Sequence, residues 1–166
     1  MYRVFLLTTV FVSVFVGAFM ASVPSVMAQS TESELRNVKA FKVYVTGFNE
    51  ASLACGLEPE AMKDAFLQPL RDAGPVMAEE ANGYWIAIRA TSVVRQEATC
   101  VTFVDASVLQ STRYFNQATD SERVGKVLHW ADAGLIVSDE AGHGDVGKNA
   151  YLDLGRRLAE VWRRDQ

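Results

Sequence analysis

The sequence has few of the side chains that carry most enzyme chemistry. It contains 2 histidines and 2 cysteines. It has no H-E-x-x-H pair of zinc ligands and no G-x-S-x-G nucleophile turn. These absences remove the usual sequence signatures of zinc peptidases and serine hydrolases. We therefore expect a protein that is not an enzyme and that needs no cofactor.

The chain also lacks an excess of basic residues. It has 16 Lys and Arg against 20 Asp and Glu, which gives a net charge of −4. A mildly acidic protein is not attracted electrostatically to nucleic acid or to an anionic bilayer. We expect neither of them as a partner.

The first 28 residues have the pattern of a cleaved export signal. Arg3 provides the positive start, an apolar run extends from Val4 to about Phe19, and small residues occupy the cleavage positions in Val26-Met27-Ala28. The apolar run is too short and too often interrupted by Ser and Thr to span a bilayer. No cysteine near the cleavage site is placed to carry a bacterial lipoprotein anchor. We expect cleavage after Ala28, a periplasmic or secreted location, and no stable membrane anchor.

Cys55 and Cys100 are the two cysteines of the chain. In an oxidising compartment such a pair indicates one disulfide. Closing a loop of this length removes about 4 kcal/mol of unfolded-chain entropy. The alternative is a reactive thiol at Cys55, because this residue precedes an expected helix whose positive end would lower the thiol pKa. The export signal favours the disulfide.

Hydrophobic periodicity predicts the elements of one domain, residues 38–166, after a flexible lead-in at 29–37. Alternating apolar residues predict strands at 41–46, 84–91, 101–108, 126–130 and 135–138. A period of 3.6 residues predicts helices from about Pro59 to Gly74 and from about Val146 to Arg164, the second with Asp145 as its N-cap. This order predicts an α+β fold, a two-layer sandwich in which two helices pack on one face of a four- to five-stranded, largely antiparallel sheet.

Residues 138–145, between the last strand and the last helix, are a candidate metal or catalytic site. The segment is predicted to be a glycine-rich loop, and it contains Asp139, Glu140, His143 and Asp145. These residues support an alternative function, a small secreted hydrolase or metal-dependent enzyme. Their spacing matches neither a zinc site nor a calcium loop, so we expect a solvated turn and a helix cap instead.

The sheet face opposite the helices is the candidate partner surface. Alternation places Trp85, Arg89 and Tyr44 on this face. Aromatic side chains in strands also pack on neighbouring strands, which is the alternative interpretation of Tyr44 and Trp85. We expect an envelope protein as the partner, bound by contact with this face or by strand addition at an edge.

Short stretches of the sequence resemble small exported bacterial proteins of unknown function. The stretches are Val43-Tyr44-Val45, Ala54–Leu57, Leu70–Gly74 and Ala159–Asp165. The layout is also similar to the α/β modules of periplasmic envelope-complex proteins, such as the amino-terminal domain of TolB. This resemblance implies no catalytic residue. Together with the missing catalytic motifs, it leads to the hypothesis of a periplasmic, non-enzymatic binding or interaction module of the bacterial cell envelope.

Overall fold

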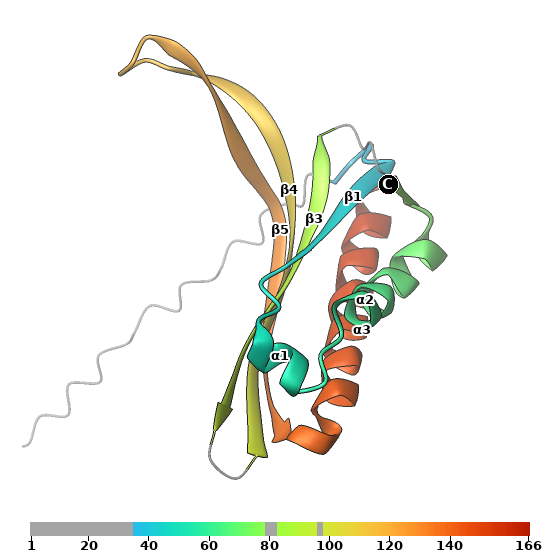
Figure 1. Ribbon diagram of the computed structural model, residues 1–166. Coiled ribbons are helices and arrows are strands. Elements are labelled where there is room, and N and C mark those ends of the chain that lie inside the picture. Colours follow the sequence, from blue (N-terminus) through green and yellow to red (C-terminus); the bar gives the residue numbers. More distant parts are fainter. Residues whose placement is uncertain (1–34, 79–82, 96–97) are drawn as a thin grey trace, which may run out of the picture. The chain divides into compact units, whose positions relative to one another are not determined.

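The computed structural model describes residues 35–78, 83–95 and 98–166, which form a sheet with helices on one side (Figure 1). The strands lie in the order β2-β1-β3-β4-β5. Their bounds are Ala40–Thr46 for β1, Val76–Met77 for β2, Tyr84–Arg95 for β3, Thr99–Asn116 for β4 and Ser121–Asp139 for β5. The helices are Glu50–Ala54 (α1), Pro59–Ala73 (α2) and Glu140–Asp165 (α3). The predicted α+β class is confirmed.

The sheet is mixed, which corrects the expectation of a largely antiparallel one. Strand β1 pairs in parallel with both β2 and β3, whereas β3 with β4 and β4 with β5 are antiparallel. The chain between β1 and β3 contains α1, α2 and β2. A long crossover of this kind returns the chain to the end of the sheet at which β1 began, so β1 and β3 run in the same direction. Strand β2 is only two residues long, too short to produce a periodic pattern.

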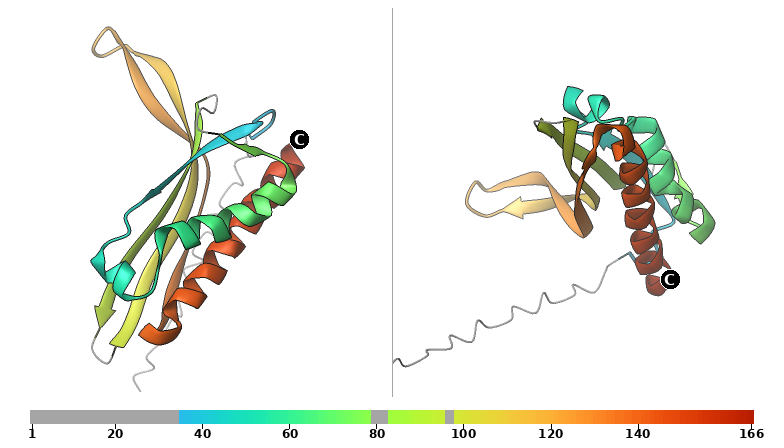
Figure 2. Two further views of the ribbon diagram at one scale, coloured as in Figure 1. Left: turned by 45° about the vertical axis from the view of Figure 1, so that its right-hand side comes forward. Right: turned by 90° about the horizontal axis from the view of Figure 1, so that it is seen from below.

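Helices α2 and α3 lie side by side and cover one face of the sheet in both views of Figure 2. Alternate strand residues and the apolar stripes of the two helices are buried against one another. The largest of these side chains are Phe41, Ile86, Ile88, Phe66, Leu70, Tyr151, Leu154 and Leu158. The predicted packing of the last helix beside the first long helix is therefore confirmed.

Gly155 lets α3 approach the backbone of α2 closely. A Cβ atom at this position would overlap the carbonyl oxygen of Phe66 and would lie 3.0 Å from its carbonyl carbon. Backbone atoms inside a helix cannot rotate away as the end of a flexible side chain can. A glycine is therefore required for the observed distance between the two helices.

Strands β4 and β5 are much longer than the sequence analysis predicted. They contain 18 and 19 residues, so β4 continues past the predicted end at 108 to Asn116, and β5 joins the predicted strands 126–130 and 135–138 into one strand. Strand β3 begins at Tyr84, which pairs with Gln110, and from Ser111 onward β4 pairs only with β5 among the described strands. The two strands project past the rest of the sheet as an arm (Figures 1 and 2). Both faces of such an arm are solvated, so its residues do not alternate between apolar and polar.

Helix α3 begins at Glu140, not at Val146 as predicted. Asp139 is its N-cap, and its Oδ1 atom accepts a hydrogen bond of 3.0 Å from the backbone N–H of Gly142. The segment predicted to be a glycine-rich loop is thus the first turns of a helix. Gly144 serves close packing there, because a Cβ atom at this position would lie 2.6 Å from the carbonyl oxygen of Gly56.

Cys55 and Cys100 form the disulfide that the sequence predicted. The two Sγ atoms are 2.02 Å apart and the two Cα atoms 6.0 Å apart. Cys55 follows α1, and Cys100 lies at the start of β4. The bridge is fully buried and ties the segment before α2 to the sheet.

The amino-terminal end of the described region is anchored to the carboxyl end of α3. Leu35 is fully buried, and its backbone N–H donates a hydrogen bond to Oδ2 of Asp165 at 3.2 Å. The predicted signal peptide at 1–28 lies outside the described residues, as does most of the predicted lead-in. Among the helices that the structure describes, none combines the length and the apolar character needed to cross a membrane.

Candidate functional site

In the described part of the chain, helices cover only one face of the sheet, and the other face is exposed. We call this second surface the open face. The register of β3, β4 and β5 arranges its side chains in rows that cross the three strands. The rows are Val93, Val101, Val137; then Thr91, Phe103, Leu135; then Arg89, Asp105, Ala133.

The first two of these rows are mostly apolar, and several of their side chains are exposed. Leu135 is 68% exposed, Val137 59%, Val93 52% and Phe103 49%. Single exposed apolar residues are common on protein surfaces, but contiguous rows mark a surface that contacts a partner. The apolar rows are therefore a candidate interaction site.

The open face is hollowed beyond the row that contains Arg89. The hollow has a volume of about 440 Å³ and is built by strands β1, β3, β4 and β5. Its lining residues are Tyr44, Thr46, Trp85, Ala87, Arg89, Leu109 and Lys126. The structure thus brings together all three residues of the predicted partner face, Tyr44, Trp85 and Arg89.

Two lysines lie over the aromatic rings of this region. The Nζ atom of Lys126 is 5.4 Å from the ring centroid of Trp85, and that of Lys42 is 5.2 Å from the ring centroid of Tyr44. Such contacts hold an ammonium group over the electron-rich face of a ring. Neither lysine forms an ion pair with a carboxylate of the described residues. The alternation of the sequence pointed to the aromatic residues but not to the two lysines.

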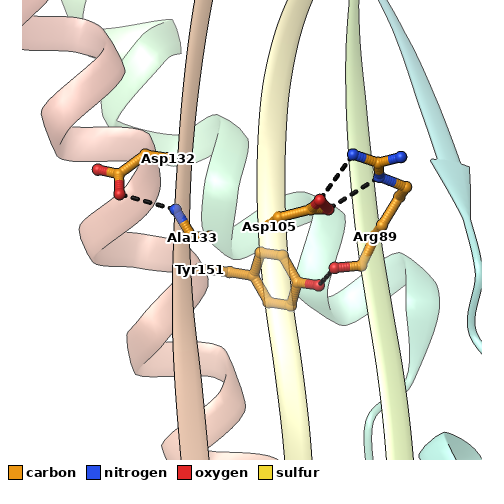
Figure 3. Close-up of polar contacts among 5 residues, drawn as sticks. All are labelled: Arg89, Asp105, Asp132, Ala133 and Tyr151. Atoms are coloured by element: carbon orange, nitrogen blue, oxygen red, sulfur yellow. Dashed lines mark hydrogen bonds and ion pairs between the residues drawn. The ribbon is translucent and has the colours of Figure 1, made fainter. Parts of the chain in front are cut away.

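Arg89 and Asp105 form the boundary between the hollow and the apolar rows. Two hydrogen bonds join them, Nε to Oδ1 at 2.9 Å and Nη2 to Oδ2 at 2.6 Å (Figure 3). From the opposite side of the sheet, the hydroxyl of Tyr151 donates a hydrogen bond of 2.5 Å to the carbonyl oxygen of Arg89. Burial, with a smaller contribution from the Asp105 carboxylate, raises the pKa of Tyr151, so the phenol stays protonated and remains a donor. Arg89 is therefore held through both its side chain and its backbone.

The middle of the outer edge of β5 is occupied by a side chain of the same strand. The Oδ1 atom of Asp132 accepts a hydrogen bond of 2.7 Å from the backbone N–H of Ala133 (Figure 3). The other carboxylate oxygen pairs with Arg157 of α3. An added strand pairs through free backbone groups, and charged residues on edge strands oppose such pairing. The contact of Asp132 with Ala133 thus disfavours strand addition at this point.

The structure places the predicted metal-site residues 139–145 at the start of α3. Asp139 caps the helix, and His143 is fully buried. Both ring nitrogens of His143 already have partners, since Nε2 is 2.7 Å from Thr102 Oγ1 and Nδ1 is 2.7 Å from Ser138 Oγ. Within residues 35–78, 83–95 and 98–166, no group of three or more His, Cys, Asp and Glu side chains is arranged to hold a metal ion.

His143 ends a buried chain of hydroxyl groups that the sequence analysis missed. Thr102 Oγ1 lies 2.7 Å from Ser92 Oγ, which lies 2.9 Å from Ser52 Oγ. A catalytic serine and histidine pair usually includes a carboxylate that orients the ring, whereas here hydroxyl groups contact both nitrogens. These linked hydroxyl groups therefore satisfy one another's hydrogen-bonding capacity where α1, the sheet and α3 meet. Ser92 and Thr102, polar residues at core-facing positions of two strands, were the sequence signal for them.

No family model matches this chain, and no curated protein matches it. Among solved structures, a PelC dodecamer from Paraburkholderia phytofirmans is 13% identical, with 76% of this chain and 88% of that chain covered and a TM-score of 0.47. A minor lipoprotein from Acinetobacter baumannii is 6% identical, with 77% and 94% covered and a TM-score of 0.37. At these values the likeness assigns neither a function nor a site residue to this chain.

Proposed function

We propose that this protein is an exported, non-enzymatic interaction module of the bacterial cell envelope, and that its open face binds a protein partner. The observation that carries the proposal is the pair of exposed apolar rows on β3, β4 and β5. Helices α2 and α3 already complete the core on the opposite face. Burying the apolar rows against a partner removes their side chains from water at about 25 cal/mol per Å².

The amino-terminal pattern and the disulfide support the proposed location outside the cytoplasm. Arg3, the apolar run after it and Val26-Met27-Ala28 form the sequence pattern of a cleaved signal. The disulfide between Cys55 and Cys100 is the form that two cysteines take in an oxidising compartment.

The rival function, a hydrolase or metal-dependent enzyme that uses residues 139–145, has less support. An imidazole that acts as a base or as a metal ligand needs a free nitrogen. Both nitrogens of His143 are hydrogen-bonded, and its ring is fully buried. The open face, in contrast, is accessible.

Contact with the open face is favoured over strand addition as the binding mode. Asp132 occupies the N–H group of Ala133, which an added strand would need at the middle of the β5 edge. Leu135 and Val137 lie on the same strand but point their side chains onto the open face. A partner that packs on this face covers them without displacing Asp132.

Site-specific photo-crosslinking in the producing cell tests the proposal. A photoreactive amino acid is placed at Leu135 on the open face or, as the matched control, at Gln68 on the exposed side of α2. We expect one discrete protein adduct of defined mass from position 135 in the exported fraction, and none from position 68. Equal adducts from both positions, or no adduct from position 135, would contradict the proposal.

A further inference from the structure

We infer that the hollow of the open face receives an acidic segment of the protein partner, whose carboxylates pair with Lys42 and Lys126. This inference rests on the proposed function, because it assumes that a partner docks on the open face. It adds the chemistry of the part of the partner that enters the hollow.

The charges around the hollow differ in sign from the charge of the whole chain. The chain carries a net charge of −4. The described charged residues that line the hollow are Arg89 and Lys126, and Lys42 lies next to it over the ring of Tyr44. Asp105 neutralises Arg89 through their paired hydrogen bonds. Among the residues that the structure describes, no carboxylate pairs with Lys42 or Lys126. An acidic ligand is complementary to this region, whereas a basic ligand is repelled by it.

The geometry of the lysines matches a ligand that lies across the strands. Lys42 is on β1, opposite Trp85 of β3, and Lys126 is on β5. The side chain of Lys126 extends over the ring of Trp85. The floor of the hollow is thus aromatic and aliphatic. Lys126 lines one side of it, and Lys42 lies next to it, over the ring of the lining residue Tyr44. Apolar surface with a few charged groups at its margin is typical of sites that bind one specific ligand.

The apolar rows indicate that the acidic ligand is a protein segment. They continue from the hollow across the row of Arg89 and Asp105, so one ligand can cover both regions. Such a ligand needs aliphatic or aromatic side chains as well as carboxylates, and polypeptides supply both. An acidic polysaccharide has no aliphatic side chains. An anionic bilayer selects denser clusters of basic residues than these two lysines.

Binding of defined peptides to the purified exported protein tests the inference. The probe is a short labelled peptide in which Glu alternates with Leu and Ser, and the controls are the same peptide with Gln or Lys in place of every Glu. Fluorescence anisotropy should show that the Glu peptide binds the most tightly. Removing both ammonium groups, with Lys42→Gln and Lys126→Gln together, should weaken its binding roughly tenfold, since each exposed ion pair contributes a modest amount. Lys148→Gln, on the exposed side of α3, should leave its binding unchanged.

Equal affinity for the three peptides, or an equal loss from Lys148→Gln, would overturn the inference. Binding of polygalacturonate, or of vesicles of phosphatidylethanolamine and phosphatidylglycerol, that depends on Lys42 and Lys126 would overturn it too. The crosslinking experiment separates the two proposals. If position 135 gives its adduct but the lysine variants bind every probe as the parent does, the inference of an acidic segment is wrong and the proposed function stands. If position 135 gives no adduct, both proposals fail.

Discussion

The guanidinium group of Arg89 and the carboxylate of Asp105 face each other across β3 and β4 and share two hydrogen bonds. The carboxylate side chain is 16% exposed, whereas the arginine side chain is 53% exposed. The pair lies between the apolar rows and the hollow, so it joins two surfaces of different chemistry. A partner that covers both surfaces also covers this pair.

Removing one member of this pair should cost stability. Arg89→Ala leaves Asp105, which is mostly buried, without its partner, and we expect the free energy of unfolding to fall by about 1 kcal/mol. Arg89→Lys keeps the charge but loses the two-pronged geometry, so it should recover only part of the loss. Denaturant melts of Arg89→Ala, of Asp105→Ala and of the double variant measure the coupling between the two side chains. A coupling energy of zero would show that the pair contributes nothing to folding.

Gly155→Ala should destabilise the packing of α3 against α2. Alanine favours a helix over glycine by about 1 kcal/mol, so an unhindered position would gain stability. At Gly155 the new Cβ atom would overlap the backbone of Phe66, and we expect a net loss of roughly 2 kcal/mol instead. The comparison is Gly147→Ala, where the new Cβ atom meets the end of the Leu57 side chain, which can rotate. Thermal melts should place Gly155→Ala clearly below Gly147→Ala, and the reverse order would contradict the described approach of the two helices.

His143 should make stability depend on pH. Burial lowers its pKa below the ordinary value of 6.5, so the unfolded chain takes up a proton at a higher pH than the folded protein does. The contribution of neutral His143 to the free energy of unfolding is therefore complete above pH 6.5. It is lost as the pH falls below that value, by at most about 1.4 kcal/mol per pH unit. Urea melts between about pH 5 and 7.5, in which most other groups do not titrate, measure this slope. The variant His143→Gln should have a lower stability at pH 7.5 and a smaller slope, and an unchanged slope would assign the effect to another group.

The disulfide should be a major part of the stability of the domain. Cys55 and Cys100 are 45 residues apart, and a bridge over such a distance contributes roughly 4 kcal/mol in the chain-entropy model. The variant in which both cysteines are alanine should therefore melt at a lower temperature by more than ten degrees or so. Thiol titration of the denatured, unreduced parent should detect no free thiol. Free thiols in protein taken from the producing cell would favour the reactive-cysteine alternative.

The sequence predicted those elements that have a buried apolar stripe and a clear stop. Pro59 is the first residue of α2 and Gly74 is its C-cap. Both positions were expected, because the fixed φ angle of proline suits the first turn of a helix and glycine is favoured where a helix ends. Alternation also placed Tyr44, Trp85 and Arg89 correctly on one face, because side chains in strands alternate whatever their partners are.

The parts that the sequence did not predict depend on tertiary contacts. The glycines at 142 and 144 suggested a loop, but at Gly144 the close approach of Gly56 makes glycine useful inside a helix. The arm is solvated on both faces, so no apolar pattern marks it. The position of Lys126 over Trp85 depends on the register between β4 and β5, which a single sequence does not reveal.

The central claim is that the apolar rows of the open face bind a protein partner, and one affinity measurement tests it most directly. The partner identified by crosslinking at position 135 is titrated with the parent protein and with the variant Leu135→Ser, Val137→Ser. Both side chains are more than half exposed, so the variant should keep the melting temperature of the parent. We predict that its affinity for the partner is at least roughly tenfold lower, because two apolar contacts are lost. An unchanged affinity at an unchanged melting temperature would contradict the assignment of the open face as the binding surface.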